Sequence, residues 1–169
     1  MQKVYFAGKF NIEKNFTKKL SDRLENDYRA KILGGGEKLS IPSNKLFITK
    51  EILYSGPFYC EQASNGNFTS TDCNAVVDSE FKAVRECNLY FAVFDEAFSV
   101  GTIVELGWAI ENKKDIIIFY KEEESSYAIK SDYWFAICDA IKRAKSIKVF
   151  SFKDINEVIE TIKDGEIFN

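Results

Sequence analysis

The chain has 169 residues, of which 46% are hydrophobic and 29% are charged, and its formal net charge is −3. This length suits one well-packed domain, which we expect to span residues 1–169. The acidic balance argues against a nucleic-acid surface, because phosphate contacts need clustered Lys and Arg. No apolar run approaches the roughly 18 residues of a membrane span, and the first ten residues turn polar too early for a signal peptide. We therefore expect a cytoplasmic protein with neither nucleic-acid nor membrane partners.

The residue types present narrow the possible chemistry. The sequence contains no histidine, and its four cysteines lie at wide, irregular spacings (Cys60, Cys73, Cys87 and Cys138). A structural zinc site is therefore not expected. Without histidine, Ser-His and Cys-His catalytic pairs are excluded, and proton transfer falls to carboxylates, Tyr, Lys or water. The basic residues Lys142, Arg143 and Lys145 are best interpreted as a solvated helix face.

In chain order, the first predicted strand covers residues 3–7 and ends at Gly8. An amphipathic helix should follow, because apolar residues recur at four-residue spacing (Ile12, Phe16, Leu20 and Leu24). The three glycines at 34–36 lack a phosphate-binding pattern and predict a flexible turn. Residues 46–54 are rich in β-forming residues and end in a turn signal at 55–58. Residues 59–74 are polar without periodicity, which predicts a long loop.

The second half continues the alternation of helices and strands. A helix is predicted over residues 75–88, with a buried stripe of Val77, Phe81, Val84 and Cys87. Further strands are predicted at 89–94, 115–120 and 147–150. Three further helices are predicted: one begins at residue 101, one ends near residue 145, and one covers residues 154–163. Such alternation implies a parallel sheet with helices on both faces.

The central feature is the strand at 89–94, its closing carboxylate Asp95, and the helix that begins near Gly101. This order places Glu105 in the first turn or so of a helix beside the carboxyl end of a buried strand, the edge where α/β proteins bind ligands. We expect a carboxylate there to stay ionised and to be able to act as a nucleophile. The alternative is structural, because Thr102 and Glu105 also fit a capping box.

Three glycine-containing loops should meet at this edge. They are Gly8 to Phe10, Gly56-Pro57-Phe58, and Asp95 to Thr102. Glycine lets backbone approach a ligand closely, and the nearby aromatic residues can form flat apolar walls (Tyr5, Phe6, Phe10, Phe58 and Phe98). An aromatic cleft with a few carboxylates suits a nucleobase and sugar better than an inorganic anion.

Several segments resemble the nucleoside 2-deoxyribosyltransferase family. They are YFAGKF at 5–10, SGPFY at 55–59, CN at 87–88, VFD at 93–95 and, most specifically, GTIVELGWA at 101–109. The resemblance implies a flavodoxin-like, Rossmann-like three-layer α/β sandwich with a mostly parallel five-stranded sheet. It implies cleavage of the N-glycosidic bond of deoxyribonucleosides or, as in relatives, of nucleoside 5′-monophosphates, without a cofactor.

The same resemblance implies roles for individual residues. Glu105 would be the nucleophile, Tyr5 would orient it, and Asp95 would lie near the sugar or base. The acid that protonates the base would be Asp78 or Glu80. Counting back without a gap from Asn88, where the family usually has Asp, favours Glu80. We favour Asp78, because a short side chain at a helix start is held more rigidly; Glu80 then becomes a substrate-binding candidate together with the three loops, including Gly101 and Thr102.

Two questions stay open at this stage. The first is whether this fold could instead serve as a binding module for a nucleotide or an NAD-derived signal, with Glu105 only capping its helix, or as an NAD-cleaving hydrolase. The second is assembly. A homo-oligomer, at least a dimer, is expected, because the segment 127–141 carries consecutive aromatic residues (Tyr133, Trp134 and Phe135) and because family members are typically oligomers.

Overall fold

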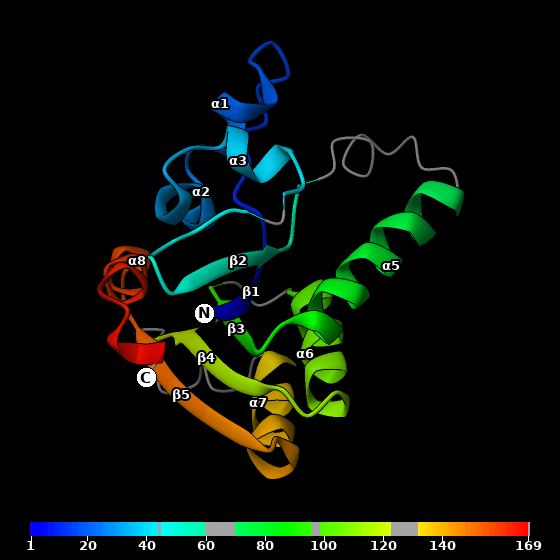
Figure 1. Cartoon of the computed structure of the whole chain (residues 1–169), viewed down its shortest axis with the longest axis vertical. Helices are drawn as coiled ribbons and strands as arrows, with labels where there is room; N and C mark the ends of the chain where they lie inside the picture. Colours follow the sequence, from blue (N-terminus) through cyan, green and yellow to red (C-terminus); the bar gives the residue numbers. More distant parts are fainter. Residues whose placement is uncertain (44, 60–69, 96–98, 123–131, 169) are drawn as a thin grey trace.

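The computed structural model describes residues 1–43, 45–59, 70–95, 99–122 and 132–168. Five parallel strands form its sheet, in the order β2-β1-β3-β4-β5 (Figure 1). Their bounds are β1 Gln2–Gly8, β2 Ile52–Gly56, β3 Leu89–Phe94, β4 Asp115–Lys121 and β5 Ser146–Phe152. This order is that of flavodoxin-like proteins and confirms the predicted fold class.

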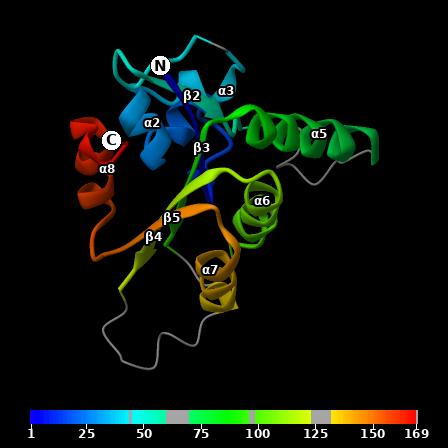
Figure 2. The same ribbon diagram turned by 60° about the horizontal axis from the view of Figure 1, so that its bottom comes forward.

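Helices cover both faces of the sheet (Figure 2). One face carries α1 (Leu20–Leu24), α2 (Tyr28–Leu33), α3 (Glu37–Ser40) and α8 (Ile155–Asp164). The other carries α5 (Ser70–Glu86), α6 (Val100–Glu111) and α7 (Asp132–Arg143). A short 3-10 helix, η2 (Glu166–Phe168), follows α8. None of the described helices is long and apolar enough to span a membrane.

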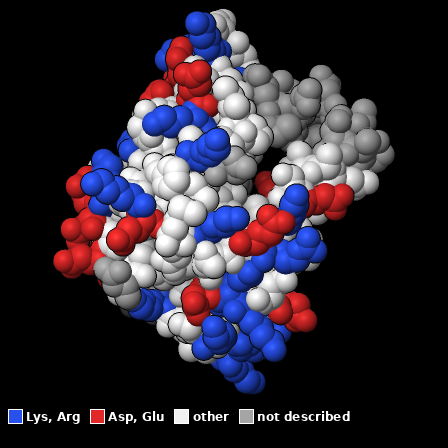
Figure 3. Space-filling model, viewed as in Figure 1, with Lys and Arg blue, Asp and Glu red and all other residues white. Residues whose placement is uncertain are grey.

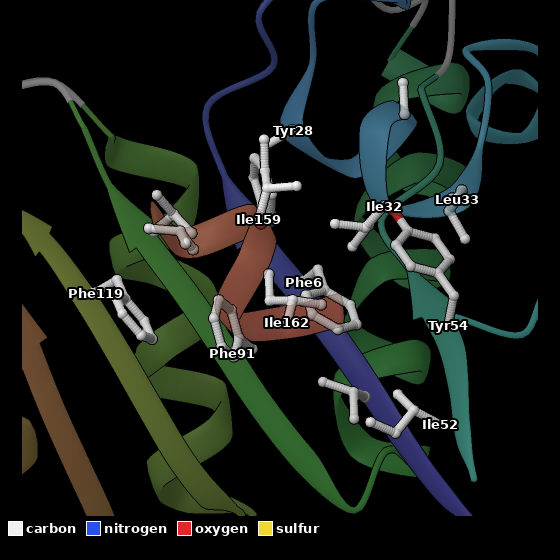
Figure 4. Close-up of a cluster of buried hydrophobic side chains, with 14 of the residues drawn as sticks. Phe6, Tyr28, Ile32, Leu33, Ile52, Tyr54, Phe91, Phe119, Ile159 and Ile162 are labelled. Atoms are coloured by element: carbon white, nitrogen blue, oxygen red, sulfur yellow. The ribbon is translucent and has the colours of Figure 1, made fainter. Parts of the chain in front are cut away.

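Alternation along the strands builds a separate core on each face. Phe6, Phe91 and Phe119 point toward α8 and meet Ile159 and Ile162 there (Figure 4). The neighbouring strand residues point the opposite way, into the core under α5, α6 and α7 (Tyr5, Ala7, Tyr90, Ala92, Ile116 and Ile118). Because both faces are covered, β3 is buried at all six positions, as its continuous apolar run predicts.

The helix predicted through residues 12–24 is wrong over most of its length. Only Leu20–Leu24 is helical, and Phe16 is 69% exposed. The backbone N–H of Glu13 donates to the carbonyl of Arg23 at 2.9 Å, and Arg23 Nε donates to the carbonyl of Glu13 at 3.0 Å. These bonds fold residues 13–19 back on α1, so the four-residue apolar spacing does not mark a helix.

Other boundaries differ less. The turn at 34–36 is confirmed, since Gly34 ends α2 with a left-handed conformation. The strand predicted at 46–54 is shorter, because Phe47 turns back to form an antiparallel bridge with Leu53. Helix α5 begins five residues before the predicted start at 75, and Val77 is 47% exposed rather than part of a buried stripe.

Charged side chains of both signs are interspersed over the surface in Figure 3, with Lys and Arg gathered where α7 ends and β5 begins. Lys142, Arg143 and Lys145 are exposed there, which confirms the solvated face. Arg143 pairs with Asp139 at 2.5 Å.

Candidate active site

Glu105 lies in the second turn of α6, where its carboxylate Oε1 accepts a 2.7 Å hydrogen bond from the hydroxyl of Tyr5 on β1. The helix is preceded by Ser99, and Thr102 is a buried residue inside it. The capping-box alternative is therefore wrong, because Thr102 is not the N-cap. The carboxyl is directed toward the sheet instead of back to the helix start.

Tyr5 is held on three sides. Its ring stacks on that of Tyr90, its partner on β3, with 5.9 Å between centroids. The Tyr90 hydroxyl donates to the carbonyl of Thr102 at 2.9 Å, which ties this stack to α6. On the β2 side Tyr5 faces Gly56, where a Cβ atom would lie 3.2 Å from the ring and where φ is +137°. Glycine is needed there because a side chain would push Tyr5 away from Glu105.

The environment of Glu105 favours the neutral acid. Burial is the main cause that raises the pKa of Glu105 to about 8, and the nearby charge of Glu80 adds to it. The hydrogen bond from Tyr5 and the charge of Arg29 lower this pKa. The expectation that this carboxyl stays ionised is wrong for the free protein at neutral pH. Desolvation outweighs the favourable helix start, because the side chain is only 7% exposed. Burial also raises the pKa of Glu80.

A cavity of about 1120 Å³ is lined by Tyr5 and Glu80, two residues that act on Glu105, whereas Glu105 itself is not among its lining residues. It lies between α5, the carboxyl end of β2 and the segment 40–43. Aromatic residues and carboxylates share its wall (Tyr5, Tyr54, Phe58, Tyr59, Glu80 and Glu86). A cavity of this size, apolar with a few polar groups, is typical of small-molecule sites.

The structure brings most of the predicted residues of the β2 turn and of α5 to this cavity. Gly56, Pro57 and Phe58 line it, and so does Glu80. Asp78 is exposed and is not among its lining residues. Two positions along a helix are separated by about 200° of rotation, so only one of these carboxyls faces the cleft. Glu80, and not Asp78, is the one whose charge acts on Glu105.

The remaining candidates lie elsewhere along the same edge of the sheet. Gly8 ends β1, and the ring of Phe10 packs on Tyr59 with 5.1 Å between centroids. Asp95 lines a smaller hollow of about 320 Å³, together with Lys9, rather than the large cavity.

Helix α6 supplies the last two candidates. Gly101 is exposed at its first turn and Thr102 is buried. The expected aromatic wall is wrong at Phe6, which is fully buried in the core under α8. Phe98 lies outside the described residues. Within the parts of the chain that the structure describes, no cluster of three acidic or cysteine side chains is arranged to hold a metal ion.

Sequence reasoning missed a buried ion pair across the sheet from Glu105, between Asp27 and Arg29. The available signal was an aspartate directly before an apolar helical pattern, which is a favourable N-cap. It was obscured because the preceding helix was placed at residues 12–24.

No family model and no curated protein sequence matches this chain. Among solved structures, it is similar to the CMP N-glycosidase BcmB of Clostridium botulinum, with a TM-score of 0.52 and 17% sequence identity. The match covers 95% of this chain and 98% of that one. The likeness therefore concerns the fold, which the two proteins share over nearly their whole lengths.

Proposed function

We propose that this protein is an enzyme that cleaves the N-glycosidic bond of nucleosides or of their 5′-monophosphates, with Glu105 as the nucleophile. The observation that carries the proposal is the buried carboxyl of Glu105, held by Tyr5 and placed near a second carboxyl, Glu80. An anion at this position is poorly solvated and repelled. Positive charge that develops on a sugar in an oxocarbenium-like transition state would stabilise it, which is the differential binding that accelerates a reaction.

The reaction would proceed in two displacements. The carboxylate of Glu105 attacks the anomeric carbon, the carbon–nitrogen bond breaks, and its electron pair leaves with the base, which takes up a proton. Water, or a second base, then attacks the same carbon and releases Glu105, with net retention of configuration. Tyr5 holds Oε1 of Glu105, and Oε2 would be the oxygen that attacks the sugar.

Glu80 is better placed than Asp78 to deliver the proton. It lines the cavity, and burial raises its pKa, so it holds a proton more readily than an exposed carboxyl. The reactive arrangement has Glu105 ionised and Glu80 protonated. Two carboxyls that repel each other share a single proton over a range of pH, and the positive sugar would draw that proton onto Glu80.

The cavity supports a nucleotide as substrate. Phe58 and Tyr59 are half-buried and offer aromatic surface to a base, and the exposed Lys3 and Lys82 line the same cavity, where a 5′-phosphate would need positive charge. The structurally similar BcmB is described as acting on CMP, which makes nucleoside monophosphates the first substrates to test.

The test is incubation of the protein with nucleosides, deoxynucleosides, their 5′-monophosphates and NAD, with released bases measured by mass spectrometry. Base release by the wild type and its loss in Glu105→Gln are expected. A 2-fluoro-deoxynucleoside or its monophosphate should leave a sugar adduct on the peptide that contains Glu105. Binding of a nucleotide with no release, and equal binding by Glu105→Gln, would instead identify a binding module.

We also propose that the protein is a homo-oligomer, at least a dimer. On α7, Phe135 is 81% exposed and Ile141 is 52% exposed, which leaves an apolar face for contact with a second copy. Light scattering at micromolar concentration should give at least twice the mass of one chain. A monomeric mass for the wild type would contradict this proposal.

A further inference from the structure

The ion pair between Asp27 and Arg29 is fully buried, with neither side chain exposed. Asp27 precedes α2 and accepts a 2.9 Å hydrogen bond from the backbone N–H of Arg29. The guanidinium grips the same carboxylate with two bonds, from Nε to Oδ1 at 2.7 Å and from Nη2 to Oδ2 at 2.8 Å. Burial alone would lower the pKa of Arg29, but Asp27 raises it above its ordinary value, so the guanidinium stays charged.

The rest of the guanidinium holds the carboxyl end of β1. Nη1 donates to the carbonyls of Phe6 at 3.3 Å and Gly8 at 2.9 Å, and Nη2 donates to that of Lys9 at 3.1 Å. Together with the two bonds to Asp27, all five N–H groups of Arg29 have acceptors. The Asp27 carboxylate also accepts the N–H of Asn11 at 2.8 Å.

Aromatic rings complete the enclosure. The guanidinium carbon of Arg29 lies 3.8 Å from the centroid of the Phe10 ring and 4.9 Å from that of the Tyr28 ring. The pair therefore fixes residues 6–11, which are the last residues of β1 after Tyr5 and the loop that follows the strand. Stability alone does not account for this arrangement, because apolar residues in place of a buried ion pair are often as stabilising or more so.

The charge of Arg29 also reaches the proposed catalytic carboxyls. The groups that act on Glu105 come from three elements: Tyr5 on β1, Glu80 on α5 and Arg29 on α2. Tyr90 on β3 in turn senses the charge of Glu105, which helps to raise the pKa of its hydroxyl. Burial and the mutual repulsion of the carboxyls favour their neutral forms, and Arg29 opposes this for both Glu105 and Glu80. Tyr28 and Tyr54 also sense the charge of Glu105, and burial raises their pKa values.

We propose that the Asp27–Arg29 pair is a positioning element of the Glu105 site: it fixes the β1 loop beside Tyr5 and supplies the positive charge that favours the reactive anion of Glu105. The inference rests on the proposed nucleophilic role of Glu105. Arg29 acts through other groups and does not touch the substrate.

The test compares variants that separate charge from folding. Arg29→Gln alone would leave Asp27 as an unpaired buried anion, so the informative variant is the double substitution Asp27→Asn with Arg29→Gln, which removes both charges. Arg29→Lys keeps the charge but loses the fork that grips residues 6, 8 and 9. Arg143→Gln, which breaks an exposed pair with Asp139, is the matched control.

The readout is the titration of Glu105, followed by carbon-13 NMR of labelled glutamate and assigned with Glu105→Gln. In the double variant we expect the midpoint to move to higher pH, because Arg29 lowers the pKa of Glu105 in the wild type and Asp27 is not among the groups that shift it. The limb of the kcat/KM profile near pH 8 should move by the same amount. Arg29→Lys should keep the midpoint near that of the wild type but raise KM, and the control should change neither.

An unchanged Glu105 midpoint in a double variant with native circular dichroism would overturn the inference. The proposed function fails separately: if the wild type releases no base from any substrate while the midpoint still moves, the charge coupling stands and the assigned reaction does not. Should the double variant lose its native circular dichroism, Arg29→Lys decides. Arg29→Lys keeps the positive charge, so its Glu105 midpoint should stay near that of the wild type. A clear upward move of the midpoint in folded Arg29→Lys would contradict a role for the charge.

Discussion

Two buried ionisable sites lie on opposite faces of the sheet, and they are built in opposite ways. Under α2, Arg29 has an acceptor for every N–H and a carboxylate partner. Under α6, Glu105 receives one hydrogen bond from the described residues, that of Tyr5, and is repelled by Glu80. In both sites burial is the largest influence on the pKa of the ionisable group. In the first site the two charges compensate each other and hold the backbone. In the second site the anion of Glu105 is destabilised, which makes it reactive toward a developing positive charge.

The largest effect is expected from removing the uncompensated group. Glu105→Gln should lower turnover by about 10³-fold or more, as for loss of a nucleophile. At high pH, Glu105→Gln should also be more stable than the wild type. The folded pKa of Glu105 is about 8, and the unfolded value is about 4.3. The folded state therefore binds more protons across that window, and the wild type loses stability as pH rises through it.

The gain in unfolding free energy of Glu105→Gln should be on the order of 5 kcal/mol at pH 9 and absent at pH 4. Urea denaturation at the two pH values measures it. Glu111→Gln, an exposed carboxyl at the end of the same helix, is the control and should change neither activity nor stability. Equal stability of Glu105→Gln and wild type at pH 9 would show that the carboxyl is not strained by burial.

Breaking the compensated site should have the next largest effect, on stability. Asp27→Ala leaves the guanidinium of Arg29 buried without a counter-charge, which typically costs about 3–5 kcal/mol. Asp139→Ala breaks an exposed pair with Arg143 and should produce no measurable change. The two are compared by urea denaturation at pH 7. A small, equal loss in both would mean that Asp27 is not needed to hold Arg29.

The proton shared by Glu105 and Glu80 predicts an intermediate effect. Because the reactive form retains one proton, kcat/KM of the wild type should fall about tenfold between pH 7 and pH 9. Glu80→Gln removes the acid, so only ionised Glu105 should matter. Activity, though lower, should then increase with pH to a plateau. Asp78→Asn is the control and should keep the wild-type profile; if Asp78→Asn inverts the profile instead, Asp78 is the acid.

Tyr5→Phe should give the smallest effect. The hydroxyl of Tyr5 lowers the pKa of Glu105, so its removal should move the limb near pH 8 upward by about half a unit. Tyr90→Phe keeps the ring stack and the Tyr5–Glu105 bond, and should leave the limb in place. The full pH profile of kcat/KM for the two variants is the measurement, and equal shifts would argue against a specific role of Tyr5.

The sequence by itself determined the fold class and the position of Glu105 along it. The apolar runs of β3 and β4 are local patterns, and a parallel sheet buried on both faces follows from them. The glycine-containing turn at 55–58 also led correctly to the cavity. These inferences succeeded because each depends on neighbours within a few residues.

Only the tertiary structure decided which groups meet. Tyr5 and Glu105 are 100 residues apart, and their hydrogen bond depends on the pairing of β1 with β3 and the packing of α6. Packing against the sheet sets the rotation of α5 about its axis and turns Glu80 inward. The spacing of apolar residues in the sequence indicated this rotation only approximately. The raised pKa of Glu105 and the closed Asp27–Arg29 pair likewise arise from burial. Desolvation is a property of the assembled neighbourhood, and no local pattern of residues encodes it.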